Sequence, residues 1–343
     1  MKNNSKYKLI ALLQTLAVPL AVFMIMSVID YAVTGSGLIS SSVDLKGFMR
    51  SLITWFAFAM ALNVNLSCGR MDLSLGAQMC MGCILGGNFA MSLGFGGIGI
   101  ILVSMVVGTG CGLIVGTLFV NLKILPMVLG LGCTLVFECI SYACYNSQGL
   151  MLYGKQGTDI LSNVSFIIAV VVILVVVMTI ILQISSFGYR RRAIQGSQRL
   201  ASDAGINVFS NCLVCYALAG ALVALAGVFT TAYSGSLTPV LGMSSNGKVF
   251  SNMFPMMLGG WIAGFMGNQS IGVLAGSCSV YFLKAGLSKL GLDDLTSTIF
   301  VYGAWLLFLI YLNNKDVISY NKKRKQRKAE SQQMRAALLA AKV

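Results

Sequence analysis

Two acidic residues in apolar surroundings are the first candidates for chemistry in this sequence. Glu138 lies within the apolar stretch 126–145, and Asp72 immediately precedes the stretch 73–93. A carboxyl group in such a stretch is costly to bury, so it faces the protein interior or water. Glu138 is interpreted either as a pathway or gate residue or as a structural hydrogen-bond partner. Asp72 is interpreted as a helix cap, as a partner of Arg70, or as a substrate contact.

Uncharged polar residues also interrupt the apolar stretches. Amide and hydroxyl groups beside an aromatic ring could bind a polar ligand, but the same groups also hold packed helices together. Both interpretations stay open. Together with Glu138, the candidates for a translocation path are Asn63, Asn65, Gln78, Asn252 and Phe254.

Several catalytic and metal-binding classes are excluded by residue type. The chain has no His and ten Cys, so a zinc site of mixed Cys and His and a catalytic triad with His are both impossible. The pairs Cys80/Cys83 and Cys212/Cys215 lie in apolar runs, and we interpret them as packing residues. The chain has no Gly-x-x-x-x-Gly-Lys-Ser/Thr sequence, so it cannot hydrolyse ATP through a phosphate-binding loop of that type. We predict no catalytic residue and no metal site.

The composition requires a membrane. Of the 343 residues, 57% are hydrophobic and 10% are charged, and the mean hydropathy is +0.83. Soluble domains are roughly 45–50% apolar and about 25% charged, so a soluble globular protein is excluded. The net charge of +14 does not indicate binding of nucleic acid, because the basic residues are clustered.

Ten apolar stretches are long enough to cross a bilayer as helices. We therefore predict an all-α integral membrane protein with about ten transmembrane helices, in a single membrane domain over residues 1–320 that is followed by a basic cytoplasmic tail, 321–343. The first five spans and the last five spans form two groups of equal size, which predicts two inverted five-helix halves. The predicted spans are 9–33, 48–64, 73–93, 98–122, 126–145, 164–182, 209–233, 249–266, 271–290 and 297–312.

The positions of Lys and Arg predict the orientation. Most of the 24 Lys and Arg residues fall in segments that ten spans place on one side of the membrane. Cytoplasmic loops carry such an excess, so both chain ends are predicted to be cytoplasmic. The basic run 322–328 either fixes this topology beside anionic membrane lipid or binds a partner.

The central polar segment, about residues 188–207, separates spans six and seven. Ser197 is a residue type that caps helices, and Gly205 is one that ends them, so a short helix through about Ala204 is predicted. Such a helix would lie flat under the membrane. It is either a positive-inside anchor or a docking surface for a cytoplasmic subunit.

The segment around Asp72 resembles a motif of permease subunits from bacterial ABC-type sugar importers, such as ribose, galactose and xylose permeases. That family carries Gly-Gly-x-Asp-Leu-Ser-[Val/Leu]-Gly after its second span. Here Arg70 stands in place of the second Gly. The matching residues that carry the motif are Gly69, Asp72, Ser74 and Gly76.

Further motifs follow in the order of that family. Its central loop has the pattern Gly-Asn-x-x-Ala-Ala-x-x-Ser-Gly-Ile-Asn-Val, and residues 196–208 match it at both ends. Ser197 replaces the Asn, and Leu200-Ala201 replaces the Ala pair. The later Leu-Ala-Gly run and the spaced glycines are matched by Leu225, Ala226, Gly227, Gly259, Gly260, Gly272 and Gly276.

The resemblance implies a permease subunit of an ABC importer in the bacterial plasma (inner) membrane, which moves a sugar or similar small polar solute into the cell. It implies a second permease chain, identical or different, and an extracytoplasmic solute-binding protein. It also implies cytoplasmic ATPase subunits that would hold ATP and Mg, with no cofactor in this chain. The loop residues that it assigns to ATPase coupling are Gly196, Ser197, Arg199, Leu200, Ala201 and Gly205.

Two other classes stay open. An ion- or proton-coupled secondary transporter would place its chemistry at Glu138 and Asp72, although the chain has no His for a proton relay. A structural membrane scaffold would leave the order of the motifs unexplained. Trp261, Phe265 and Met266 depart from the family pattern and leave the solute undetermined.

Overall fold

The computed structural model describes residues 2–155 and 157–315, so the predicted basic tail, 321–343, lies outside the described residues. The chain divides into two units, Met1–Gly291 and Leu292–Val343, each of which is described by itself. The prediction of a single membrane domain over residues 1–320 stays a prediction. Within the described residues, nine helices are long and apolar enough to cross a membrane.

The first unit is built almost entirely from helices. The helices are α1 Lys2–Thr34, α2 Ser42–Leu66, α3 Leu75–Ser92, α4 Gly97–Leu122, α5 Pro126–Ala143, α6 Val164–Thr179, α7 Ser186–Gly196, α8 Gln198–Asp203, α9 Val208–Ser234, α10 Asn246–Met266 and α11 Gln269–Lys289. The short elements are the 3-10 helices η1 Cys144–Ser147 and η2 Asp159–Ser162, the π-helix η3 Ile180–Ile184, and the antiparallel strands β1 Leu150–Met151 and β2 Ser236–Leu237.

The third predicted span, 73–93, corresponds to α3, which is not among the nine candidate spans. This helix contains Gln78 and Asn88, which lower its hydropathy, but it packs against α4, α5 and α9 inside the first unit. A helix that is enclosed by other helices needs less apolar surface than one that faces lipid. The prediction of an all-α membrane protein with about ten transmembrane helices is confirmed.

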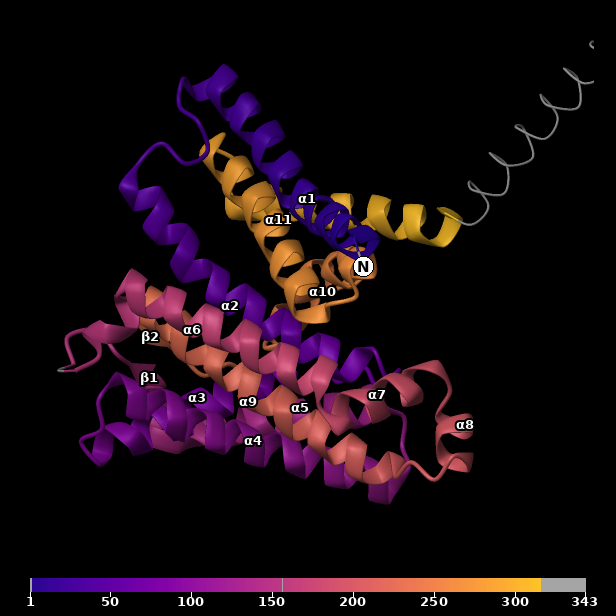
Figure 1. Ribbon diagram of the computed structural model, residues 1–343. Coiled ribbons are helices and arrows are strands. Elements are labelled where there is room, and N and C mark those ends of the chain that lie inside the picture. Colours follow the sequence, from indigo (N-terminus) through magenta and orange to yellow (C-terminus); the bar gives the residue numbers. More distant parts are fainter. Residues whose placement is uncertain (1, 156, 316–343) are drawn as a thin grey trace, which may run out of the picture. The chain divides into compact units, whose positions relative to one another are not determined.

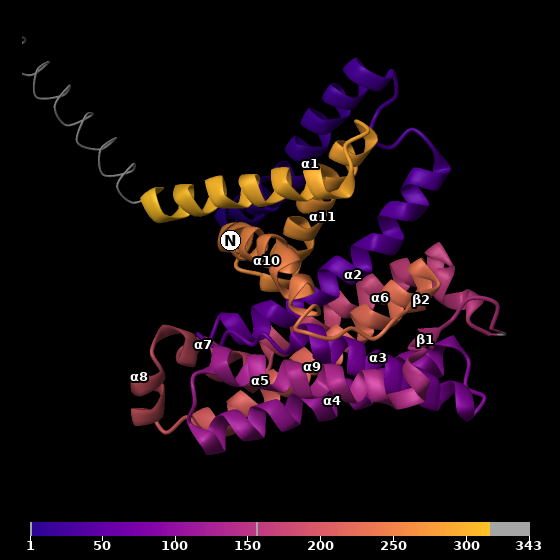
Figure 2. The same ribbon diagram turned by 180° about the vertical axis from the view of Figure 1, so that it is seen from behind.

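Helix α2 lies between two groups of helices (Figures 1 and 2). On one side α3, α4 and α9 pack against one another, and on the other side α1, α10 and α11 do so. The helix begins at Ser42 rather than at residue 48 as predicted, because Ser41 and Asp44 form a capping box. The Ser41 hydroxyl accepts from the Val43 N–H at 3.2 Å, and the Asp44 carboxylate accepts from the Ser41 N–H at 3.1 Å.

The third and fourth spans of each predicted half pack through small residues. Between α3 and α4, a Cβ on Gly86 would lie 2.5 Å from the Ser104 Cα; between α10 and α11, a Cβ on Gly276 would lie 2.5 Å from the Gly259 nitrogen. Backbones approach this closely only where side chains are absent. One such contact lies in each predicted half, and the inverted arrangement of the two halves stays a prediction.

The second unit contains one long helix in its described part, Asp294–Lys315. Asp293 precedes this helix, and its carboxylate accepts a hydrogen bond from the Thr296 hydroxyl. The helix corresponds to the last predicted span, 297–312. Its start is earlier than predicted because Asp293 and Thr296 organise an additional turn.

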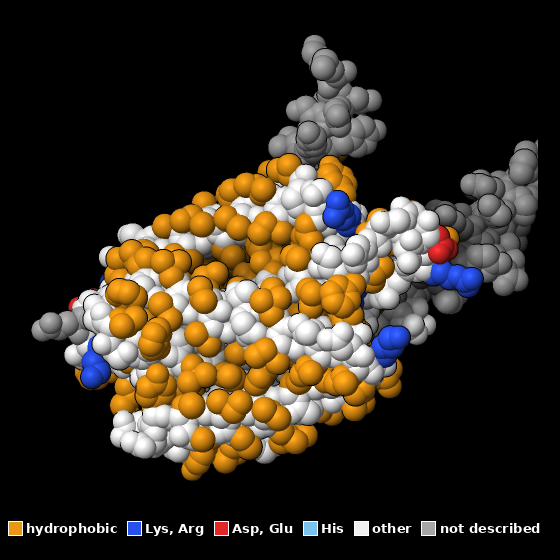
Figure 3. Space-filling model, turned by 90° about the horizontal axis from the view of Figure 1, so that it is seen from below, with side chains coloured by type: hydrophobic (Ala, Val, Ile, Leu, Met, Phe, Trp, Pro, Cys, Tyr) orange, Lys and Arg blue, Asp and Glu red, His pale blue; other side chains and the backbone are white. Residues whose placement is uncertain are grey.

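The surface of the molecule is largely apolar. Figure 3 shows hydrophobic side chains spread over most of the face in view, with only a few isolated Lys and Arg side chains. Along α4 and α5, for example, Val106, Val128 and Val136 are all exposed. An apolar surface of this extent is stable only against lipid or another protein chain.

Candidate functional site

The central polar segment forms two short helices, α7 and α8, which we call the coupling segment (residues 186–203). Figures 1 and 2 both place it at the end of the α3/α4/α9 group opposite to β1 and β2. The Ser197 hydroxyl accepts from the Leu200 N–H at 3.4 Å and caps α8. Gly205 follows the helix with a φ of 79°, which favours glycine. The predicted short helix with these two ends is confirmed.

Helix α8 has one exposed side and one buried side. Leu200 is 71% exposed, and Arg199 is exposed beside it. Ala201 is buried and packs in a small apolar cluster with Cys68 and Ile194. The exposed side therefore presents an apolar and a cationic side chain next to each other, which suits a docking surface.

Arg191 of α7 is buried, with only 1% of its surface exposed. Its guanidinium donates to the Asn63 carbonyl at 2.7 Å, to the Val64 carbonyl at 3.2 Å, and to the Ser67 hydroxyl. It also donates to the Gln269 side-chain oxygen at 2.8 Å. Burial lowers the pKa of Arg191, but a guanidinium remains charged in proteins.

These bonds join the coupling segment to two membrane helices. Asn63 and Val64 lie in the last turn of α2, at the negative end of the helix dipole, and the Asn63 carbonyl also accepts from the Ser67 N–H at 3.3 Å. Gln269 is the first residue of α11. A movement of α7 would therefore pull on the end of α2 and on the start of α11 through a single side chain.

In the sequence, Arg190, Arg191 and Arg192 are three consecutive basic residues of a predicted cytoplasmic segment, with nothing in the charge pattern to distinguish them. The structure separates them, because Arg190 and Arg192 are exposed. The sequence contains a pattern that distinguishes Arg191 from its two neighbours. Gly188 and Ile194 flank Arg191 at three-residue spacing, and the three residues form the buried face of α7.

Asp72 binds the beginning of α3. One carboxylate oxygen accepts from the Ser74 N–H at 2.9 Å and from the Ser74 hydroxyl at 2.6 Å, and the other accepts from the Gln78 amide at 3.0 Å. The carboxylate is therefore used at the positive end of a helix, as in the capping interpretation. Arg70 does not pair with it, and its Nη1 atom is buried without a hydrogen-bond partner.

Glu138 of α5 is completely buried. Its two carboxylate oxygens accept from the Met243 N–H at 2.8 Å and from the Ser245 N–H at 2.9 Å, just before α10 begins. Both oxygens thus hold backbone groups of a non-helical segment that would otherwise be unsatisfied. In this conformation Glu138 has no surface open to a solute.

One face of α5 holds the starts of both α3 and α10. Gly130, Thr134 and Glu138 are spaced four residues apart and lie on one face. A Cβ on Gly130 would lie 2.8 Å from the Leu73 nitrogen. The Thr134 hydroxyl lies 3.4 Å from the Leu73 carbonyl and 3.4 Å from the Asn246 side-chain oxygen.

The starts of α3 and α10 also touch each other. A Cβ on Gly76 would lie 2.1 Å from the Ser245 carbonyl oxygen, so only glycine fits at this position. We call this region the helix-start junction, defined by residues 69–78, the α5 face and residues 243–246. Two positive helix ends meet here, and the carboxylates of Asp72 and Glu138 supply the opposite charge.

The candidates for a translocation path are not gathered in one place. Asn63 lies with Arg191, and Gln78 lies with Asp72. Two cavities of about 430 Å³ lie on the described part of the chain, and no path candidate lines either one. The remaining candidates are Asn65, which is buried without a side-chain partner, Asn252, which donates to the Lys248 carbonyl at 2.8 Å, and buried Phe254.

The cysteine pairs lie inside the helix packing. Cys80, Cys83, Cys212 and Cys215 are buried free thiols, and the Cys83 sulfur contacts the Thr231 hydroxyl at 3.4 Å. On the described residues, no group of three or more His, Cys, Asp and Glu side chains could hold a metal ion. Their burial as free thiols is consistent with the prediction that they are small packing residues.

Known proteins resemble this chain over most of its length. The family described as "Branched-chain amino acid transport system / permease component" matches residues 44–311. The chain is 26% identical over 290 residues to the fructose import permease protein of Rhizobium meliloti, which covers 81% of this chain and 79% of that protein. It is 30% identical over 136 residues to the ribose import permease protein of Bacillus subtilis (strain 168), which covers 40% of this chain and 41% of that protein.

A solved structure shares the fold. An inward-facing metal-chelate type ABC transporter superposes with a TM-score of 0.53 at 13% identity and covers 88% of this chain and 98% of that one. These matches are consistent with the order of the motifs and with the number of helices. They are also consistent with a sequence that contains no ATP-binding loop. The chain is thus a multi-pass membrane protein that belongs to the family of branched-chain amino acid transport system permease components, the membrane subunits that work with the ATPase components of ABC transporters.

Proposed function

We propose that this chain is the permease subunit of an importer that carries a sugar or a similar small polar solute into the bacterial cell. The relatives that are named for fructose and ribose import support this substrate class. ATP and Mg would bind in separate cytoplasmic ATPase subunits, and this chain would not be an enzyme. A solute-binding protein outside the membrane would deliver the solute.

The observation that carries the proposal is the connection through Arg191. Helix α8 presents Leu200 and Arg199 to a partner, and α7 is bonded to α2 and α11 through a buried guanidinium. An ATPase that binds α8 would move α7, and Arg191 would transmit that motion to α2 and α11. A rigid-body shift of helices of this kind opens one side of a path and closes the other.

A second permease chain, identical or different, completes the proposed path. One face of α5 is occupied by the helix-start junction, while Val128 and Val136 are exposed. An exposed apolar face that carries no bulky charge is suited to a partner helix within the membrane. The solute would pass between the two chains, which accords with the burial of Glu138 within one chain.

The test compares two exposed apolar residues at opposite ends of the helices. Leu200→Asp should reduce the amount of ATPase subunit that co-purifies with the tagged permease at least tenfold, and should abolish ATP-driven uptake in proteoliposomes. Tyr153→Ser changes a side chain that is 89% exposed and follows β1, and it should leave both unchanged. Gradient-driven uptake by the chain alone, without any ATPase, would instead establish the secondary transporter.

A further inference from the structure

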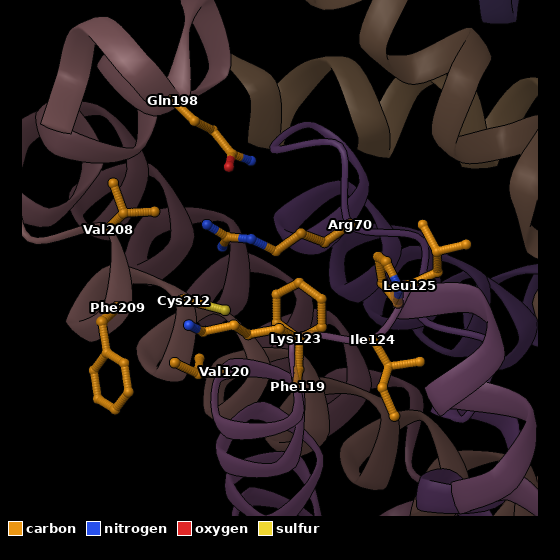
Figure 4. Close-up of a pocket in the computed structure, with 11 residues that line it drawn as sticks. Arg70, Phe119, Val120, Lys123, Ile124, Leu125, Gln198, Val208, Phe209 and Cys212 are labelled. Carbon is orange, nitrogen blue, oxygen red and sulfur yellow. The ribbon is translucent and has the colours of Figure 1, made fainter.

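A cavity of about 430 Å³ lies beside the coupling segment, and we call it the Arg70 pocket (Figure 4). Three regions of the chain form it: the loop after α2, the turn from α4 to α5, and the beginnings of α8 and α9. In Figure 4 the side chains of Arg70 and Lys123 extend into the space between these regions, and Gln198 extends toward it from α8. The residues that line it are Arg70, Phe119, Val120, Lys123, Ile124, Leu125, Pro126, Gln198, Val208, Phe209 and Cys212.

The pocket holds positive charge that the chain does not balance. Arg70 is only 3% exposed, and its Nη1 atom has no hydrogen-bond partner. Lys123 adds a second cation, and no acidic side chain is among the lining residues. Asp72, the acid nearest in sequence, is already bonded to Ser74 and Gln78. A buried guanidinium without a counter-charge is costly, so an anion that enters the pocket would be stabilised.

We propose that the Arg70 pocket binds a phosphate ester, with Arg70 and Lys123 holding the phosphate group. The planar guanidinium can donate two parallel hydrogen bonds to phosphate oxygens, and the ammonium can neutralise a second charge. A phosphate monoester carries about −1.5 to −2 charges at pH 7, which matches two cations. The rings of Phe119 and Phe209 line the pocket for the organic part of the ester.

The start of α5 supports the same ligand. Leu125 precedes the helix and provides no side-chain cap, and Pro126 has no N–H, so the first free amide groups of this helix are those of Met127 and Val128. The N-terminal end of a helix attracts anions, and here it adds to two cationic side chains. The resembled motif has Gly where this chain has Arg70, so the site would belong to this chain and not to the permease family in general.

The position of the Arg70 pocket places a bound ligand next to the coupling segment. Gln198 begins α8, and Val208 begins α9, so a bound phosphate would hold the turn from α4 to α5 against the coupling segment. On the orientation given under the proposed function, the pocket opens to the cytoplasm. A phosphorylated compound inside the cell could then restrain the motion of α8. Binding itself can be tested without any transport assay.

The experiment measures binding to the purified full chain by its thermal melting in detergent. Inorganic phosphate is compared with chloride at equal ionic strength. Phosphate should raise the melting temperature of the unaltered protein by several degrees, and Lys123→Gln should weaken the apparent affinity at least tenfold. Lys155→Gln, which changes an exposed lysine after β1, should have no effect on phosphate binding.

Two further arms identify the ligand source and guard against misfolding. Arg70→Lys keeps one charge and should bind phosphate weakly, while Arg70→Gln should not bind it. Lys123 is exposed, so Lys123→Gln remains informative if both Arg70 variants fail to fold. Stabilisation by phosphatidylglycerol over phosphatidylcholine in nanodiscs, lost in Lys123→Gln and without a phosphate effect, would assign the site to a lipid headgroup. No Lys123-dependent effect of either probe, or an equal loss in Lys155→Gln, would overturn the proposal.

Discussion

Arg191 in the coupling segment and Glu138 in the helix-start junction are both enclosed charged side chains, but they meet opposite ends of helices. Arg191 donates to carbonyl groups in the last turn of α2, whereas Glu138 accepts from amide groups just before α10. Asp72 repeats the second arrangement at the start of α3. In these three cases the sign of the buried charge is opposite to that of the helix end whose backbone groups it binds.

The two regions also differ in what they connect. Arg191 links an exposed segment to membrane helices. Its hydrogen bonds would therefore transmit a force that a partner protein applies to that segment. Glu138 links only buried elements, so its bonds hold the unit together and are not positioned to receive a force. We therefore expect changes at the helix-start junction to act mainly on stability, and changes in the coupling segment to act mainly on transport.

The largest effect is expected at Glu138. Glu138→Leu removes the acceptors of two buried N–H groups, each of which costs about 1–3 kcal/mol when unsatisfied, so the free energy of unfolding should fall by about 2–6 kcal/mol. Thermal melting of the purified protein in detergent measures this. The control Asp159→Asn changes an exposed carboxylate and should leave melting unchanged; equal losses in both variants would contradict a specific role for Glu138.

A smaller loss of stability with a larger loss of transport is expected at Arg191. Arg191→Lys keeps the charge but loses most of the donors, and hydrogen bonds to charged groups contribute about 1.5–3 kcal/mol. ATP-driven uptake should fall several-fold, which is a larger loss than the decrease in melting temperature alone would explain. Arg190→Lys, one residue away and exposed, should change stability by less than about 0.5 kcal/mol. If the two variants behave alike, Arg191 is only a topology residue.

The smallest effect on stability is expected at Gly205. Gly205→Val forces a β-branched residue into the left-handed region at a φ of 79°, which costs about 1–2 kcal/mol. The end of α8 should shift, so the assembled transporter should hydrolyse ATP while taking up little solute. Gly47→Ala, in open space near the start of α2, should keep hydrolysis and uptake coupled. Normal coupled uptake in Gly205→Val would show that the geometry at the end of α8 does not affect transport.

Much of the fold could be predicted because a transmembrane helix is specified locally, by about 20 apolar residues in a row. The caps of α8 were predictable for the same reason, since Ser197 and Gly205 act on their own neighbours. The partners of Glu138 were not, because Met243 and Ser245 contribute backbone groups that carry no sequence signature. Arg191 is one of three consecutive arginines, and only the helical spacing of Gly188 and Ile194 distinguishes it from the two exposed ones.

The bonds of Glu138 also constrain the order in which the protein is made. Met243 and Ser245 follow Glu138 by 105 and 107 residues. A ribosome adds roughly 5–20 residues per second, so α5 is complete for roughly 5–20 s before its partners exist. During that interval the carboxyl group is without partners, and an ionised carboxylate is unfavourable inside a bilayer. We therefore expect this face of α5 to stay in contact with water until the start of α10 has been synthesised, and the first half to become fully stable only then.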